Sequence, residues 1–296
     1  MADEHQHLVE LEDGGVLNVI ELGNGYPLIV LHGGPGLDHH YFRPYLDPLA
    51  EQGFRVIFVD ERGQGGSPRV DPSTLTIQVF AHDIDRLARA LNLGEYAVFG
   101  HSFGAIIALS HALERGSADQ YVISAGAASS ESMMADVEHQ IDSFEPASMR
   151  EQIKRSWDQE PHLTTVAESR ELMAAQMPFH FWEMGDAYSR YMQTDDTVYA
   201  PEVTAYFAAN GYGGFEWVDH LRWITKPMLV IAGRYDRTCT VGQAEVIHRE
   251  VDGSDLVVIE KAAHMMHVEQ PKADLDAMRA WFIRQGVLPD PNAPAE

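Results

Sequence analysis

The sequence contains almost no cysteine: Cys239 is the single one among 296 residues. One cysteine excludes an intrachain disulfide and any zinc site built on cysteines. It also gives no support to secretion, because secreted proteins commonly rely on disulfides. The first residues, Met1 to His5, lack the basic start and the apolar stretch of a signal peptide. We therefore expect a cytoplasmic protein.

Cationic residues are also scarce, and long apolar runs are absent. Lys and Arg number 21 against 45 Asp and Glu, which gives a net charge of −24. A chain this acidic is repelled by nucleic acids and by anionic membranes, so neither is an expected partner. No apolar run approaches the roughly 20 residues that a membrane-spanning helix needs. We interpret the acidity as an aid to solubility or an adaptation to salt, rather than as steering of a cationic substrate.

Common cofactor motifs are missing as well. The sequence has no Walker phosphate loop and no G-x-G-x-x-G after the first strand, so nucleotide cofactors find no support. His39 with His40, and His264 with His267, are ligands by residue type, but they stand in neither an H-E-x-x-H helix nor a cysteine-histidine frame. We predict no cofactor and no metal. The expected partner is a small-molecule or short-peptide substrate, and the sequence does not indicate an oligomeric state.

The most informative segment that is present is Gly100-His101-Ser102-Phe103-Gly104. The apolar run at residues 96–99 is typical of a buried strand, and residues 105–109 begin a helical pattern. A G-x-S-x-G pentad between a strand and a helix is a nucleophile elbow, in which a sharp turn exposes the serine hydroxyl. The flanking glycines leave room for that turn. We predict that Ser102 is a nucleophile.

The order of predicted strands and helices indicates an α/β fold. Alternating apolar residues on both sides of Asp13-Gly14-Gly15 predict an antiparallel hairpin. Short apolar runs then alternate with segments of helical spacing, notably residues 80–91 and 103–113. This alternation is typical of a mostly parallel sheet with helices on both faces. The predicted strands lie at residues 28–31, 56–59, 97–99, 121–124, 227–233 and 256–259.

The alternation stops between residues 127 and 223, where Met, Glu, Gln and aromatic residues are frequent and no strand is evident. We predict a helical cap inserted there. The core is then in two parts, residues 1–126 and 224–288, and its second part ends with a helix from Pro271 to Gln285. A flexible tail is expected at residues 289–296.

A serine nucleophile needs a base, and the base needs a group that fixes its tautomer. Asp236 and His264 both follow predicted strands after the cap, and the order Ser, Asp, His is the one that nucleophile-elbow folds use. Catalytic groups in open α/β sheets gather at the carboxyl ends of strands. His267 is the rival base and Asp60 the rival acid, and we favour His264 and Asp236. We do not expect His101 to be the base, because a residue next to the nucleophile points elsewhere on a tight turn.

The oxyanion of acyl transfer needs backbone N–H donors that are already in place. The N–H of Phe103, directly after the nucleophile, is the first candidate. The second is expected in His32-Gly33-Gly34-Pro35-Gly36, where glycines let the backbone approach the substrate oxygen, and we choose Gly34. We interpret His32 as a structural hydrogen-bonding residue under this loop.

These segments resemble the proline iminopeptidase family of α/β-hydrolases. The resemblance rests on the H-G-G-P-G pentad at residues 32–36, the stretch Asp60-Glu61-Arg62-Gly63-Gln64-Gly65-Gly66-Ser67, the elbow, Asp236 and His264. It covers roughly residues 26–126 and 227–282. The resemblance implies an α/β-hydrolase fold with an inserted helical cap. It also implies a triad of Ser102, Asp236 and His264, an oxyanion hole at Gly34 and Phe103, and no cofactor.

The sequence departs from this family where specificity is set. Aminopeptidases of the family grip the substrate's amino group with cap carboxylates, and some carry a Glu directly after the triad Asp. Here that residue is Arg237, whose cation would repel an ammonium group. Glu183, Glu202 and Glu216 are the cap acids considered as a replacement grip. We interpret each of them as a solvated helix residue.

The cap also contains apolar and aromatic residues that form either a small core or an acyl pocket. They are Met173, Met177, Phe179, Phe181, Trp182, Met184, Tyr188, Tyr191 and Met192. Three functions stay open: release of an N-terminal residue from small peptides or amides, hydrolysis of an uncharged ester, lactone or amide, and non-enzymatic ligand reception on the same fold. Cys239 lies near Asp236 without an evident base, so we do not expect a second nucleophile there.

Overall fold

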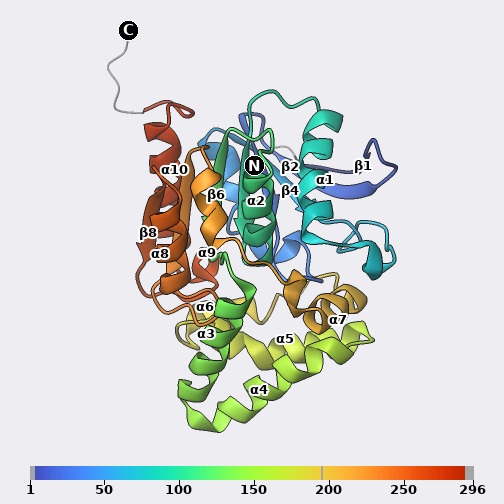
Figure 1. Ribbon diagram of the computed structural model, residues 1–296, viewed down its shortest axis with the longest axis vertical. Coiled ribbons are helices and arrows are strands. Elements are labelled where there is room, and N and C mark those ends of the chain that lie inside the picture. Colours follow the sequence, from blue (N-terminus) through green and yellow to red (C-terminus); the bar gives the residue numbers. More distant parts are fainter. Residues whose placement is uncertain (1–3, 195, 291–296) are drawn as a thin grey trace.

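A computed structural model describes residues 4–194 and 196–290, and within them the centre of the molecule is an eight-stranded sheet (Figure 1). The strands lie in the order β1-β2-β4-β3-β5-β6-β7-β8. Their bounds are β1 Glu4–Glu10, β2 Val16–Leu22, β3 Tyr26–Leu31, β4 Phe54–Asp60, β5 Ala97–His101, β6 Gln120–Ser124, β7 Met228–Gly233 and β8 Asp255–Ile259. β1 and β2 form the predicted hairpin, β2 pairs antiparallel with β4, and the pairs from β4 to β8 are parallel.

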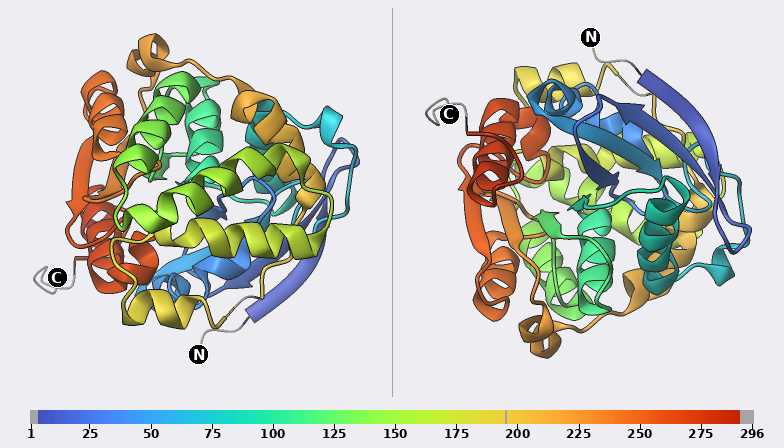
Figure 2. Two further views of the ribbon diagram at one scale, coloured as in Figure 1. Left: turned by 90° about the horizontal axis from the view of Figure 1, so that it is seen from below. Right: turned by 90° about the horizontal axis from the view of Figure 1, so that it is seen from above.

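Helices cover both faces of this sheet. α1 Ile77–Ala90 and α2 Phe103–Leu113 pack together on one face, and α8 Val241–Glu250 and α10 Pro271–Arg284 lie on opposite sides of β8 (Figure 2). Every residue of β5 and β7 is buried, because parallel strands are covered on both faces. The predicted fold class, an α/β-hydrolase sheet with helices on both faces, is confirmed.

Five α-helices lie between β6 and β7 in the described part of the chain. They are α3 Ser130–Ser143, α4 Arg150–Gln159, α5 Val166–His180, α6 Asp186–Tyr191 and α7 Pro201–Ala209. They lie together below one end of the sheet, beyond the ends of the parallel strands (Figures 1 and 2). The division into a cap domain at residues 127–223 and a two-part core stays a prediction.

The cap helices enclose a small apolar cluster of their own. Val137, Ile141, Phe144, Ile153 and Phe179 form it, and Trp157 packs against its edge. None of the described helices has the length and apolar character that crossing a membrane requires. Of the predicted tail at 289–296, residues 291–296 lie outside the described residues.

Candidate active site

Ser102 stands in the turn between β5 and α2, as the pentad predicts. Its backbone has φ 56° and ψ −119°, a conformation that a residue with a side chain rarely adopts. Gly100 and Gly104 make the turn possible: a Cβ on Gly100 would lie 2.2 Å from the Gly104 carbonyl oxygen, and one on Gly104 would lie 2.3 Å from the Leu31 oxygen. The turn leaves the Ser102 side chain on the wall of a pocket under the cap.

His264 and Asp236 are joined by a hydrogen bond in the same region. Asp236 follows β7 and His264 follows β8. The Nδ1–H of His264 donates to Oδ2 of Asp236 at 2.9 Å, because a carboxylate oxygen can only accept. The other oxygen, Oδ1, accepts the backbone N–H groups of Thr238 and Cys239 at 2.8 and 3.0 Å. Nδ1 is thus occupied, which leaves Nε2 of His264 as the nitrogen that can take a proton. His264 lines the same pocket as Ser102.

The rival base and the rival acid lie in different surroundings. The ring of His267 is buried against Tyr41 and Phe42 and does not line the Ser102 pocket, and burial lowers its pKa to about 3. Asp60 is buried and accepts hydrogen bonds from His39, Asn18 and Gly66. Burial alone would raise the pKa of Asp60, but the hydrogen bond and charge of His39 lower it. These contacts give Asp60 a structural role beneath the strand ends.

The H-G-G-P-G loop approaches the elbow closely. A Cβ on Gly33 would lie 3.0 Å from the Cβ of Ser102. The N–H of Gly33 donates to the Tyr41 hydroxyl at 2.6 Å, and the N–H of Gly36 donates to Gln64 Oε1 at 2.5 Å. Neither the N–H of Gly34 nor that of Phe103 has an acceptor among the described residues. These two N–H groups are thus available for a substrate oxygen.

His101 ties this loop to the loop that carries His264. The Tyr41 hydroxyl accepts from Gly33 and donates to His101 Nδ1 at 2.9 Å, and the Nε2–H of His101 donates to the carbonyl oxygen of His264 at 2.8 Å. Burial and the neighbouring His264 hold the pKa of His101 well below its usual range, so the ring is neutral. His101 therefore has a positioning role that the sequence did not reveal.

His32 holds the same loop from beneath. Its Nδ1 lies 2.8 Å from the carbonyl oxygen of Gly33, and its Nε2 pairs with the Glu61 carboxylate. Burial works against the charged ring, but the Glu61 carboxylate outweighs it and raises the pKa of His32 to about 9. A charged His32 under the oxyanion loop agrees with the structural interpretation of this residue.

The pocket in front of Ser102 is largely apolar and is built from the core loops and the cap. The α5 residues in the lining recur at helical spacing, so one face of this helix forms part of the pocket wall. The apolar lining includes Leu37, Leu163, Leu172, Met173, Met177 and Met265. Glu160 is the one carboxylate among the lining residues that the structure describes. Glu160 could not be singled out from the sequence, because nothing in its spacing distinguishes it from solvated cap acids.

The three cap acids considered as a replacement grip do not line this pocket. Glu183 is exposed, and Glu202 pairs with Arg69 at 3.0 Å. Glu216 accepts the N–H of Glu131 at 3.1 Å and so caps the start of α3. None of these carboxylates lines the pocket, because each has a partner or solvent on the outside of the cap.

Trp182 and Arg237 also lie outside the pocket lining. Trp182 stacks on Tyr235 with ring centroids 5.7 Å apart. Arg237 donates to the carbonyl oxygens of Phe179 and Phe181 at 3.1 and 2.7 Å, and its guanidinium lies 5.0 Å from the Phe144 ring centroid. The cation therefore faces the cap backbone and does not stand where it would repel a substrate amine.

Two further candidates have no catalytic setting. Cys239 is buried, and burial raises the pKa of its thiol well above the usual value. Asp38, His39 and His40 form the one group in the described residues whose ligand atoms lie close enough for a metal. The Nδ1 atoms of His39 and His40 are already hydrogen-bonded to Asp60 and Asp38, both at 2.7 Å. We assign neither group a role.

An elbow serine, a hydrogen-bonded His and Asp at neighbouring strand ends, and two available N–H groups are the features of an α/β-class hydrolase. The alpha/beta hydrolase fold family matches residues 26–271, and the chain belongs to this family. It is a hydrolase. A proline iminopeptidase of Saccharolobus solfataricus is 28% identical over 285 residues, which cover 89% of this chain and 86% of that protein.

Solved structures show the same fold. A proline iminopeptidase from Mycobacterium smegmatis matches with a TM-score of 0.74 and 24% identity, covering 95% of this chain and 98% of that one. An alpha/beta fold family hydrolase from Bacillus anthracis matches with a TM-score of 0.76 and 18% identity, covering 95% and 99%. The resemblance to proline iminopeptidases that the motifs indicated is thus confirmed as a similarity over most of the chain.

Proposed function

We propose that this protein is a serine hydrolase that forms an acyl-enzyme at Ser102. The Ser102 hydroxyl attacks the substrate carbonyl carbon while Nε2 of His264 takes its proton, and Asp236 holds the resulting imidazolium. The N–H groups of Gly34 and Phe103 receive the oxyanion. His264 then gives the proton to the leaving group. In the second half of the reaction, Nε2 of His264 takes a proton from a water molecule that attacks the acyl carbon, and the Ser102 oxygen leaves with that proton. The observation that carries the proposal is the buried His264–Asp236 hydrogen bond beside the elbow serine.

The pocket favours an uncharged acyl group. Its lining is mostly apolar, and Glu160 already accepts hydrogen bonds from Gln176 and Tyr212. Burial raises the pKa of Glu160, which weakens it as a partner for an ammonium group. A small ester, lactone or amide with an apolar acyl part therefore fits this pocket best.

Release of an N-terminal residue is the second candidate. It is supported by the similarity to enzymes named proline iminopeptidase and by Glu160 itself, a carboxylate inside the pocket. An ammonium group would have to draw Glu160 into its charged form. In this case Glu160, and not Glu183, Glu202 or Glu216, binds the amino group of the substrate.

The mechanism is tested by covalent labelling. A fluorophosphonate should label the wild type on Ser102, and Ser102→Ala should lose both labelling and turnover while keeping its melting temperature. Cys239→Ala is the matched control, because it removes a buried potential nucleophile and should leave labelling intact. If the wild type is not labelled, Ser102 is not an activated nucleophile, and a non-enzymatic receptor function is favoured instead.

The substrate class is tested with a panel of acyl nitrophenyl esters, acyl lactones and aminoacyl arylamides. Faster turnover of the uncharged acyl compounds supports the first candidate. Efficient cleavage of an arylamide that N-acetylation abolishes would overturn it in favour of N-terminal release. In that case Glu160→Gln should raise KM for the free amine substrate and leave acyl esters unaffected.

A further inference from the structure

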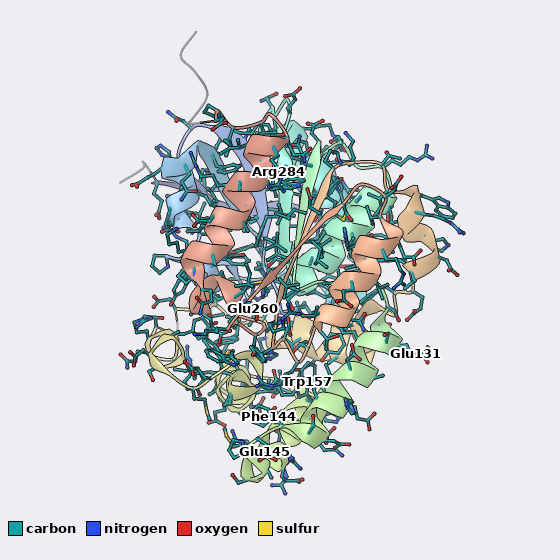
Figure 3. All side chains as sticks on the ribbon, turned by 90° about the vertical axis from the view of Figure 1, so that its left-hand side faces the viewer. Glu131, Phe144, Glu145, Trp157, Glu260 and Arg284 are labelled. Atoms are coloured by element: carbon teal, nitrogen blue, oxygen red, sulfur yellow. The ribbon has the colours of Figure 1, made fainter. Side chains whose placement is uncertain are left out.

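A group of polar side chains lies at the cap side of the pocket. Gln176 of α5 donates to Glu160 Oε1 at 2.5 Å, and the Tyr212 hydroxyl donates to Glu160 Oε2. Trp157 of α4 and Ser169 of α5 line the same pocket. Figure 3 shows Trp157 on the side of the cap that faces the sheet, above Phe144 and Glu145. We call Trp157, Glu160, Ser169, Gln176 and Tyr212 the polar cluster.

Two donors of the polar cluster have no acceptor. The indole Nε1 of Trp157 and the hydroxyl of Ser169 are buried and have no hydrogen-bond partner among the described residues. Ser169 as a whole is 3% exposed, although most serines in helices bond to the preceding turn or to solvent. A buried donor left without an acceptor costs about 1–3 kcal/mol, so two of them beside a substrate pocket point to a ligand group.

The chemistry of these donors selects the ligand group. Both groups can donate a hydrogen, so each needs an acceptor on the ligand. An ammonium group offers donors only and leaves the Trp157 N–H without an acceptor. A carboxylate is disfavoured in turn, because it would be buried close to Glu160 without a cation. A neutral carbonyl oxygen fits both requirements.

The cluster also lies at a defined distance from the reacting atoms. The Trp157 ring centroid is 6.3 Å from that of His180, and the His180 ring is 5.1 Å from that of His264. One aromatic ring thus separates Trp157 from the proposed base. An acyl chain attached to Ser102 must extend several bonds before its own atoms reach Trp157.

We propose that Trp157 and Ser169 form a subsite for a neutral carbonyl oxygen in the distal part of the acyl group. This inference rests on the proposed function, since it assigns the subsite to the acyl part of an ester or amide cleaved at Ser102. The substrate class is accordingly an oxo-acyl compound or one with a distal amide or ester carbonyl. Apolar side chains such as Leu172 and Met173 enclose the methylene groups between the two carbonyls.

The test compares nitrophenyl esters of straight-chain acids with esters of equal length that carry a ketone at the 3, 4, 5 or 6 position. At one of the distal positions the ketone should raise kcat/KM at least about 10-fold, mainly through KM. Trp157→Phe and Ser169→Ala should each remove most of that preference, so that within each variant the oxo ester and the plain ester of equal length have similar kcat/KM. Trp223→Phe and Ser156→Ala are matched controls, because Trp223 is exposed and the buried Ser156 hydroxyl already bonds to Ile153.

Binding gives a second measurement that does not need turnover. Ser102→Ala should bind the preferred oxo ester about 10-fold more tightly than the plain ester by calorimetry, and adding Trp157→Phe should remove the difference. Equal binding of the two esters overturns the subsite, even where the wild type hydrolyses neither. A preference for ω-amino esters over both also overturns it. Loss of fluorophosphonate labelling would instead count against the proposed function alone.

Discussion

Asp236 makes two kinds of contact that fix its carboxylate. One oxygen holds Nδ1 of His264, and the other is held by the N–H groups of Thr238 and Cys239. The carboxylate is therefore fixed in orientation before the reaction begins. In the proposed mechanism, this arrangement would stabilise the imidazolium formed when Ser102 gives up its proton.

Replacing this acid tests the assignment directly. Asp236→Asn should lower kcat by about 10³–10⁴-fold, because the amide can hold His264 in the wrong tautomer. Asp60→Asn should keep kcat within a few-fold and instead lower stability in urea unfolding, since Asp60 accepts bonds from His39, Asn18 and Gly66. The assignment fails if Asp236→Asn retains activity and Asp60→Asn loses it.

A second residue-scale prediction concerns Asp274, which the chemistry does not use. Its side chain is fully buried in α10, and neither carboxyl oxygen has a hydrogen-bond partner among the described residues. Burial raises its pKa from 3.8 to about 7. Between these two pH values the unfolded chain releases the proton and the folded protein keeps it. The contribution of Asp274 to the free energy of unfolding is therefore highest below pH 4, falls as the pH rises towards 7, and is constant above pH 7.

Asp274→Asn should remove this pH dependence. At pH 8 the variant should gain stability, on the order of 4 kcal/mol, because the pKa rises from 3.8 to about 7 and one pKa unit is worth about 1.4 kcal/mol; at pH 4 it should gain little. Urea unfolding at both pH values measures the difference. Asp276→Asn, an exposed carboxylate on the same helix, should change stability little at either pH. An equal effect of Asp274→Asn at both pH values would count against the raised pKa.

At the scale of elements, α5 decides both the pocket and the attachment of the cap. Its inner face carries Ser169, Gln176 and His180 towards the pocket, and its C-terminal end is bound to the core. The Arg237 guanidinium makes that bond, through the carbonyl oxygens of Phe179 and Phe181. Arg237, whose cation was expected to repel a substrate amine, thus connects the cap to the strand ends.

Arg237→Ala should loosen this connection. The lost hydrogen bonds and the lost contact with the Phe144 ring should reduce stability by about 2 kcal/mol or more. Limited proteolysis should cut the variant faster within residues 127–223 than the wild type. Arg234→Ala is the matched control, because this exposed Arg forms a surface pair with Glu260 at 2.9 Å, and such pairs contribute little. If both variants are cleaved at the same rate, Arg237 does not hold the cap.

The core elements were predictable because each follows a simple physical rule. Parallel strands covered on both faces have continuous apolar sequences, as β7 does, and catalytic groups in such sheets follow strand ends. Ser102, Asp236 and His264 could be chosen on that basis. The cap residues that line the pocket could not be predicted in this way, since packing between helices decides whether an acid such as Glu160 or Glu202 points inwards. Both look equally solvated in the sequence.

At the scale of the whole molecule, the excess of acidic residues has to be accommodated by the folded state. The net charge is −24, and several cations are already paired, such as Arg62 with Asp83 and Arg55 with Glu21. The remaining carboxylates repel one another more strongly in the compact fold than in the extended chain. Surface pairs contribute little in opposition, about 0–1 kcal/mol each.

Salt should therefore stabilise the protein at neutral pH. The Debye length falls from about 30 Å at 0.01 M to about 10 Å at 0.1 M, so most of the repulsion is screened within this range. We expect the melting temperature at pH 7.5 to rise by several degrees between these NaCl concentrations and to level off above them. Near pH 5, close to the isoelectric point of about 4.8, the same salt should have little effect. An equal rise at both pH values would indicate a general salt effect on solvation, and a flat response at pH 7.5 would mean that charge repulsion does not limit this fold.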